Sequence, residues 1–64
     1  DQDGIHLTEL SISPENRMVG KPLRETELRK DALVVLIRRN GADVIPDGDT
    51  VLLEGDLLVL CSRN

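Results

Sequence analysis

Two adjacent arginines, Arg38 and Arg39, are the residues of this chain whose type and spacing most clearly suggest binding chemistry. They directly follow the apolar run at residues 32–37. Because a guanidinium group donates two parallel hydrogen bonds to phosphate oxygens, the pair could bind an anionic ligand such as a nucleotide. A second interpretation is that Arg38 pairs with Asp43 across a hairpin while Arg39 points into water. The available cross-strand partner favours this second interpretation.

Apolar residues near the arginines complete the candidate ligand site. If a nucleotide binds there, Ile37, Ile45 and Pro46 would offer an apolar wall to its base. The chain contains no Phe, Tyr or Trp that could stack on that base. The predicted ligand-binding residues are therefore Ile37, Arg38, Arg39, Ile45 and Pro46.

Acidic residues gather in the second half of the chain, and their carboxylates could hold a hard cation such as Ca²⁺. Their spacing fits no EF-hand loop, however, and turns favour Asp for backbone reasons alone. We therefore predict no metal site among these residues, which are Asp43, Asp47, Asp49, Glu54 and Asp56.

The sequence offers no convincing catalytic group. His6 is the single histidine, and no second ligand or acid–base partner lies near it in the sequence. Cys61 shares strand parity with Leu57 and Val59, so a small buried thiol is expected there. We predict that the domain is not an enzyme and requires no cofactor.

Composition limits the classes of partner. The chain has 64 residues, a net charge of −4 and no aromatic residues, which argues against nucleic-acid binding. Its longest apolar run is six residues, far below the ~20 needed to span a bilayer, and no signal peptide is evident. A single small domain without a disulfide buries little core, so we expect a second copy to stabilise it.

The predicted elements form a small α+β domain. Residues 1–4 are interpreted as a linker remnant and residues 5–64 as the domain. Residues 5–13 have a strand pattern whose apolar parity switches near Glu9, which suggests a bulge or a partner on both faces. Pro22 favours the start of a short helix over residues 23–28, in which Leu23 docks on the sheet.

The central element is a strand over residues 32–39, followed by the turn dipeptide Asn40-Gly41. A type I′ turn there would place Arg38 opposite Asp43 and Ile37 opposite Val44. Short strands at residues 51–53 and 57–62, separated by a turn at Gly55, complete a mostly antiparallel sheet of about five strands.

Several motifs resemble the C-terminal domain of RCK regulators, also called the TrkA-C domain. These are Gly20-Lys21-Pro22-Leu23, the run Leu33-Val34-Val35-Leu36-Ile37-Arg38-Arg39, Ile45-Pro46 and Gly55-Asp56-Leu57-Leu58-Val59. The version with Pro46-Asp47-Gly48-Asp49-Thr50 is most similar to TrkA-C domains of bacterial cation/proton antiporters of the cell-volume-regulation type. No G-x-G-x-x-G fingerprint for a dinucleotide is present.

The resemblance implies a cytosolic, homodimeric regulatory domain attached to a bacterial potassium or sodium/proton antiporter. The alternative is a cyclic-dinucleotide-sensing domain of a potassium channel or of an uptake-system gating subunit. In either case the partners would be a second copy and the membrane transporter portion, at the cytoplasmic face of the membrane. Some members of the family bind cyclic di-AMP or another nucleotide at the dimer interface.

The predicted dimer interface lies on the central strand, which is apolar on both parities. Val34 and Leu36 would pack against the second subunit from one face. The alternative set is Leu33, Val35 and Ile37 on the other face, and the sequence does not decide between them.

Overall fold

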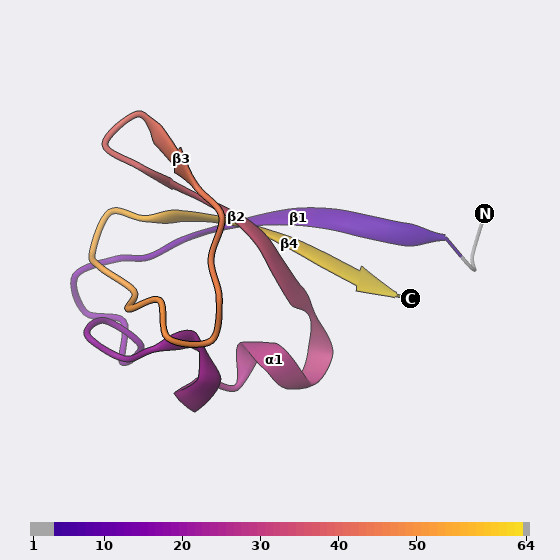
Figure 1. Cartoon of the computed structure of the whole chain (residues 1–64), viewed down its shortest axis with the longest axis horizontal. Coiled ribbons are helices and arrows are strands. Elements are labelled where there is room, and N and C mark those ends of the chain that lie inside the picture. The colour runs from indigo at the N-terminus through magenta and orange to yellow at the C-terminus, as the bar shows by residue number, and fades with distance from the viewer. Residues whose placement is uncertain (1–3, 64) are drawn as a thin grey trace.

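The computed structural model describes residues 4–63, so the predicted linker at residues 1–4 falls almost wholly outside the described residues. The elements are β1 (Ile5–Ser11), η1 (Leu23–Glu25), α1 (Leu28–Asp31), β2 (Leu33–Arg39), β3 (Ala42–Val44) and β4 (Leu57–Arg63). The four strands form one antiparallel sheet in the order β1-β4-β2-β3 (Figure 1). The small antiparallel sheet is confirmed, with four strands in the described residues where about five were expected.

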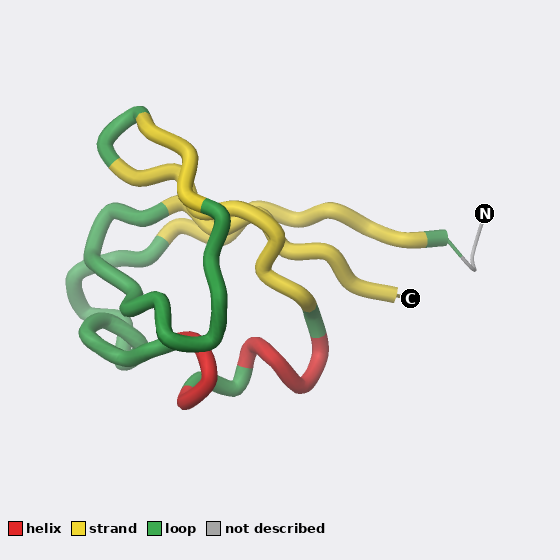
Figure 2. Tube along the Cα trace, in the orientation of Figure 1, coloured by secondary structure: helices red, strands yellow, loops and turns green. Residues whose placement is uncertain are grey.

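The missing strand is the one predicted at residues 51–53. Within this segment only Val51 pairs, in an isolated antiparallel bridge with Pro22. Two backbone hydrogen bonds flank this bridge. The Gly20 N–H donates to the Leu52 carbonyl at 2.8 Å, and the Leu52 N–H donates to the Lys21 carbonyl at 3.0 Å. Figure 2 shows the connection from β3 to β4 as loop. The strand predicted at residues 51–53 is therefore wrong, although Leu52 itself is fully buried.

The predicted helix is divided into a 3-10 turn and a single α-helical turn. Thr26 interrupts it with an extended backbone, φ −100° and ψ 162°. Its hydroxyl donates to the Leu23 carbonyl at 2.8 Å, a local bond that competes with helix continuation. Leu23 is nevertheless buried against the sheet, as predicted.

The hairpin between β2 and β3 follows the sequence prediction. Asn40 and Gly41 have φ of 52° and 78°, the positive values that a type I′ turn requires. Ile37 pairs with Val44 and Arg38 with Asp43. Gly55 also has the predicted positive φ, at 86°.

The bulge predicted near Glu9, in β1, lies on β2 instead. The register of β1 with β4 is continuous from Ile5 opposite Arg63 to Ser11 opposite Leu57. The register of β2 with β4 instead shifts between Val34 and Leu36, so that Val35 is an additional residue on β2.

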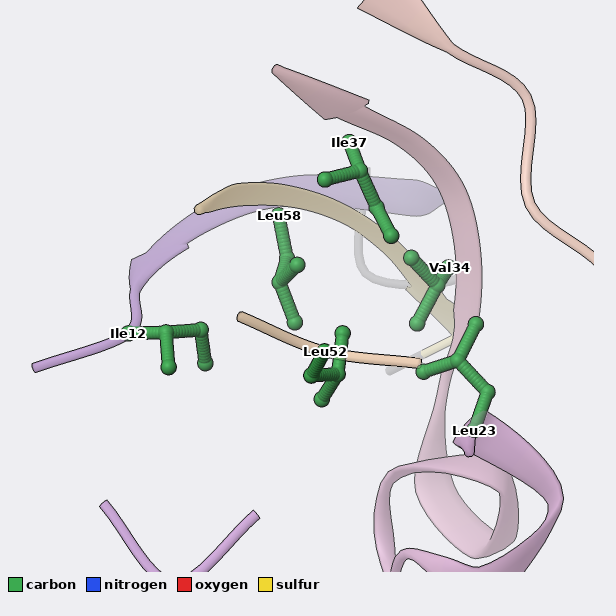
Figure 3. Close-up of a cluster of buried hydrophobic side chains, with 6 residues drawn as sticks. All are labelled: Ile12, Leu23, Val34, Ile37, Leu52 and Leu58. Atoms are coloured by element: carbon green, nitrogen blue, oxygen red, sulfur yellow. The ribbon is translucent and has the colours of Figure 1, made fainter. Parts of the chain in front are cut away.

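This bulge decides which side chains form the core. Val34 pairs with Leu60 and Ile37 with Leu58, so both belong to the same face of the sheet. That core face packs on Leu23 and on the loop residue Leu52 (Figure 3). The six buried apolar residues are Ile12, Leu23, Val34, Ile37, Leu52 and Leu58. No helix within residues 4–63 is long and apolar enough to cross a bilayer.

Candidate functional site

The two arginines of the candidate site lie on opposite faces of the sheet. Arg38 pairs in register with Leu57 of β4, whereas Ile37, one residue earlier, faces the core. Alternation along β2 then places Arg39 on the core side, where it reaches Asp56. A single ligand on one face therefore cannot contact both guanidinium groups.

Arg38 forms the predicted cross-strand ion pair. Its Nε donates to an Oδ atom of Asp43 at 3.1 Å, and both side chains are more than half exposed. An exposed pair of this kind contributes about 0–1 kcal/mol, so a stronger acceptor could displace Asp43 at small cost. Arg38 is therefore an available cation beside the hairpin.

Arg39 does not point into water, contrary to the interpretation that the sequence favoured. Its Nε and one terminal nitrogen donate to the two carboxylate oxygens of Asp56 at 2.9 and 2.8 Å. The same terminal nitrogen donates to the Val51 carbonyl at 2.9 Å. Because Asp56 is 17 residues away in sequence, the local pattern around Arg39 gave no signal for this pair.

Asp56 is almost completely buried, with 1% of its surface exposed. The hydrogen bonds from Arg39 lower the pKa of its carboxyl group below the ordinary value, and the Leu53 N–H, 2.9 Å away, acts in the same direction against the effect of burial. The carboxylate in turn raises the pKa of Arg39. This charge-assisted bidentate pair fixes the loop that carries Leu52, so its role is structural.

The remaining predicted ligand residues differ in accessibility. Ile37 is fully buried in the core, whereas Ile45 is 85% exposed directly after β3. Pro46 lines a small pocket of about 130 Å³, together with Leu23, Leu33, Val34, Asp47 and Gly48. Typical ligand pockets measure ~300–1,000 Å³, so one chain could enclose only part of a nucleotide. The accessible candidates are thus Arg38, Ile45 and Pro46.

Three of the acidic residues form separate ion pairs with arginines. Asp43 pairs with Arg38, Asp49 with Arg24, and Asp56 with Arg39. Asp47 accepts from the Asp49 N–H at 2.9 Å, which is turn chemistry. In the part of the chain that the structure describes, no three His, Cys, Asp or Glu side chains gather as metal ligands would.

The residues predicted for the dimer interface are separated by the bulge at Val35. Val34 already packs in the core of the single chain. Leu36 pairs with Val59 and so belongs to the other face, which we call the outer face. The outer face carries the exposed residues Leu7 (70%) and Leu33 (65%). Its paired apolar residues are Ile5, Leu7, Leu33, Leu36, Leu57, Val59 and Cys61.

Comparison with known proteins gives a family match over almost the whole chain. The family model of the TrkA-C domain matches residues 7–64. A Trk system potassium uptake protein TrkA homolog of Methanosarcina mazei is 38% identical over 56 residues, which cover 88% of this chain and 12% of that protein. A TrkA homolog of Pyrococcus abyssi is 28% identical over 64 residues, 98% of this chain and 28% of its own length.

The chain therefore spans between about an eighth and just over a quarter of the length of these curated relatives. A solved structure described as "Structure of RCK domain with cda" has a similar fold, with a TM-score of 0.74 and 30% sequence identity. The similarity covers 88% of this chain and 77% of that one.

Proposed function

The chain belongs to the TrkA-C domain family of RCK regulators, and we propose that it is a homodimeric regulatory domain of a potassium transport protein. The observation that carries this proposal is the family match over residues 7–64, together with curated relatives that are Trk potassium uptake proteins. The relatives favour an uptake-system gating subunit as the parent protein. A cation/proton antiporter parent, which the motif at residues 46–50 suggests, remains the second candidate.

In the proposed mechanism the domain adopts two arrangements, and the arrangement that is populated biases the activity of the transporter. A ligand or an ion changes the transporter only if it has different affinities for those arrangements. The domain would act at the cytoplasmic face of the membrane and perform no catalysis. Its partners would be a second copy of itself and the membrane-embedded transporter.

Deletion of the domain from its parent gene tests the regulatory role. A strain that lacks its own potassium uptake systems would carry either the full parent gene or the gene without residues 5–63. We expect the potassium concentration required for half-maximal growth to differ between the two strains at equal expression. Identical growth at every potassium concentration would contradict a regulatory role. Ten or more hydrophobic spans upstream in the parent gene would identify an antiporter, whereas a Rossmann half would favour a gating subunit.

We also propose that the domain binds a cyclic dinucleotide such as cyclic di-AMP. Support comes from the similar RCK domain solved with "cda", an abbreviation consistent with such a ligand. In this chain the weakly paired guanidinium of Arg38 would meet a phosphate, and the exposed Ile45 with Pro46 would meet a base. Because one chain encloses so little volume, two copies would share the ligand.

Calorimetry with cyclic di-AMP tests this ligand. We expect binding heat from the wild-type chain and at least about tenfold weaker binding by Arg38→Ala, the loss of one charge-assisted contact. Arg17→Ala, which removes an exposed arginine outside the proposed site, is the matched control and should bind normally. An absence of heat from the wild-type chain would contradict the ligand and leave the regulatory role in place.

A further inference from the structure

The ion pair between Arg38 and Asp43 uses only part of the binding capacity of the arginine. Only the Nε of Arg38 donates to Asp43, at 3.1 Å, and within residues 4–63 neither of its terminal nitrogens has a hydrogen-bond partner. The side chain of Arg39, by contrast, makes three hydrogen bonds through its Nε and one terminal nitrogen. Arg38 therefore keeps unused donors for a bidentate contact with two phosphate oxygens.

The backbone fixes Asp43 beside these donors. The type I′ turn of the projecting β2–β3 hairpin sets the register in which Asp43 lies directly opposite Arg38 (Figure 1). Directly opposite side chains leave the same face of a sheet, with their Cβ atoms about 4.5–5.5 Å apart. A phosphate bound by Arg38 is therefore a close neighbour of the Asp43 carboxylate. At a charge separation of about 6 Å in water, each unit of negative charge on the ligand weakens binding about threefold.

The row of strand residues that contains Arg38 supplies no second cation to offset this repulsion. That row crosses all four strands through Ser11, Leu57, Arg38 and Asp43. Arg39 lies on the core side, where it is paired with the buried Asp56. A phosphate at Arg38 thus meets one positive and one negative charge, and its own charge decides how strongly Asp43 repels it.

Phosphate groups differ in this charge. A phosphodiester has a single negative charge, whereas a terminal phosphate has about two at a pH well above its second pKa of about 6. The repulsion from Asp43 therefore weakens binding about threefold for a phosphodiester and about tenfold for a terminal phosphate.

We propose that Asp43 is a specificity-determining residue of the ligand site, which makes Arg38 accept phosphodiesters in preference to terminal phosphates. The inference rests on the proposed cyclic dinucleotide site and names the class of phosphate that this site takes. A carboxylate held next to the phosphate-binding guanidinium lowers the affinity for every anion, and it lowers the affinity most for the anion with the highest charge.

Calorimetry with two ligands at pH 8 and low salt tests this selectivity. The ligands are cyclic di-AMP, with two phosphodiesters, and the linear dinucleotide pApA, with one phosphodiester and one terminal phosphate. Because two copies would share the ligand, each phosphate would meet one Arg38. Asp43→Asn should therefore bind cyclic di-AMP about tenfold and pApA about thirtyfold more tightly than the wild-type chain does. The preference for the cyclic ligand should thus fall about threefold.

The ratio of the two affinities separates selectivity from a structural effect, because a general change in the hairpin would alter both affinities by the same factor. Asp43→Thr, which is neutral and favours a strand, should reproduce the result of Asp43→Asn. Glu15→Gln removes the same charge from an exposed turn residue outside the proposed site, so it is the matched control and should change neither affinity. Circular dichroism would verify that each variant is folded.

The outcomes separate the selectivity from the proposed ligand. An unchanged preference in both Asp43 variants, with cyclic di-AMP still bound by the wild-type chain, would overturn the selectivity and leave the ligand in place. Binding of cyclic di-AMP by the variants alone would contradict the ligand of the wild-type chain and support the repulsion from Asp43. Binding of neither ligand by any of the chains would overturn both and leave the regulatory role.

Discussion

Arg39 and Asp56 form a bidentate ion pair that connects the hairpin strand β2 to the loop preceding β4. The guanidinium donates to both carboxylate oxygens at 2.9 and 2.8 Å, and Asp56 is 1% exposed. Asp56 also accepts from the Leu53 N–H, while its own carbonyl accepts from Ile12 N–H at 2.8 Å. Asp56 is therefore hydrogen-bonded to β2, to the loop at Leu53 and to Ile12, three segments that enclose the core.

The first prediction is that Asp56→Ala strongly destabilises the domain. It leaves Arg39 without its partner and the Leu53 N–H without an acceptor. We expect a loss of about 2–4 kcal/mol, less than for a fully buried pair because Arg39 retains a quarter of its side-chain exposure. Asp43→Ala breaks the exposed pair with Arg38 and should cost about 0–1 kcal/mol. Urea unfolding measures both, and equal losses would show that Asp56 is not the structural anchor.

The second prediction concerns the stability of the domain at acidic pH. Because the folded state lowers the pKa of Asp56 below its ordinary value of 3.8, the pair stabilises the fold fully above that value. This contribution is lost as the pH falls from about 3.8 through the lower pKa of the folded state. The difference in unfolding free energy between wild type and Asp56→Asn should thus be constant near neutral pH and shrink below about pH 4. A difference that persists unchanged in stronger acid would contradict the lowered pKa.

The third prediction uses the turn at Gly41. Its φ of 78° is unfavourable for an L-residue, although an added Cβ would meet no atom within 4 Å. Gly41→Ala should therefore cost about 1 kcal/mol or slightly more through backbone strain alone. A synthetic chain with D-alanine at position 41 is the control, since D-residues favour positive φ. It should be at least as stable as wild type in a thermal melt, and equal destabilisation by both isomers would refute the strain argument.

The fourth prediction separates two adjacent leucines in a loop. Leu52 is fully buried in the core, whereas Leu53 is 44% exposed. Leu52→Ala should lower the unfolding free energy by about 2–5 kcal/mol, a large fraction of the stability of so small a domain. Leu53→Ala should change it by well under half of that amount. Similar effects would mean that the loop is not part of the core.

Local chemistry explains which features could be predicted from the sequence. The dipeptide Asn40-Gly41 determines the hairpin turn, and the register that places Arg38 opposite Asp43 follows from it. The family motifs likewise identified the domain. Both depend on residues that are close together in the chain or on a fixed order of short motifs.

The features that were predicted wrongly depend on distant contacts or on residues with equal hydrophobicity. Arg39 finds its partner 17 residues away, so nothing adjacent to it indicates burial. Residues 32–37 are all apolar, and no pattern among them indicates that Val35 is the bulge residue. Without the bulge, strict alternation would exchange core and outer side chains for one half of β2, which is why the candidate interface could not be fixed from sequence.

Sedimentation equilibrium of the wild-type chain tests the central claim most directly. The account predicts a folded species of about twice 7.1 kDa at micromolar concentration, with reversible dissociation on dilution. A folded species of 7.1 kDa across the whole micromolar range would contradict it.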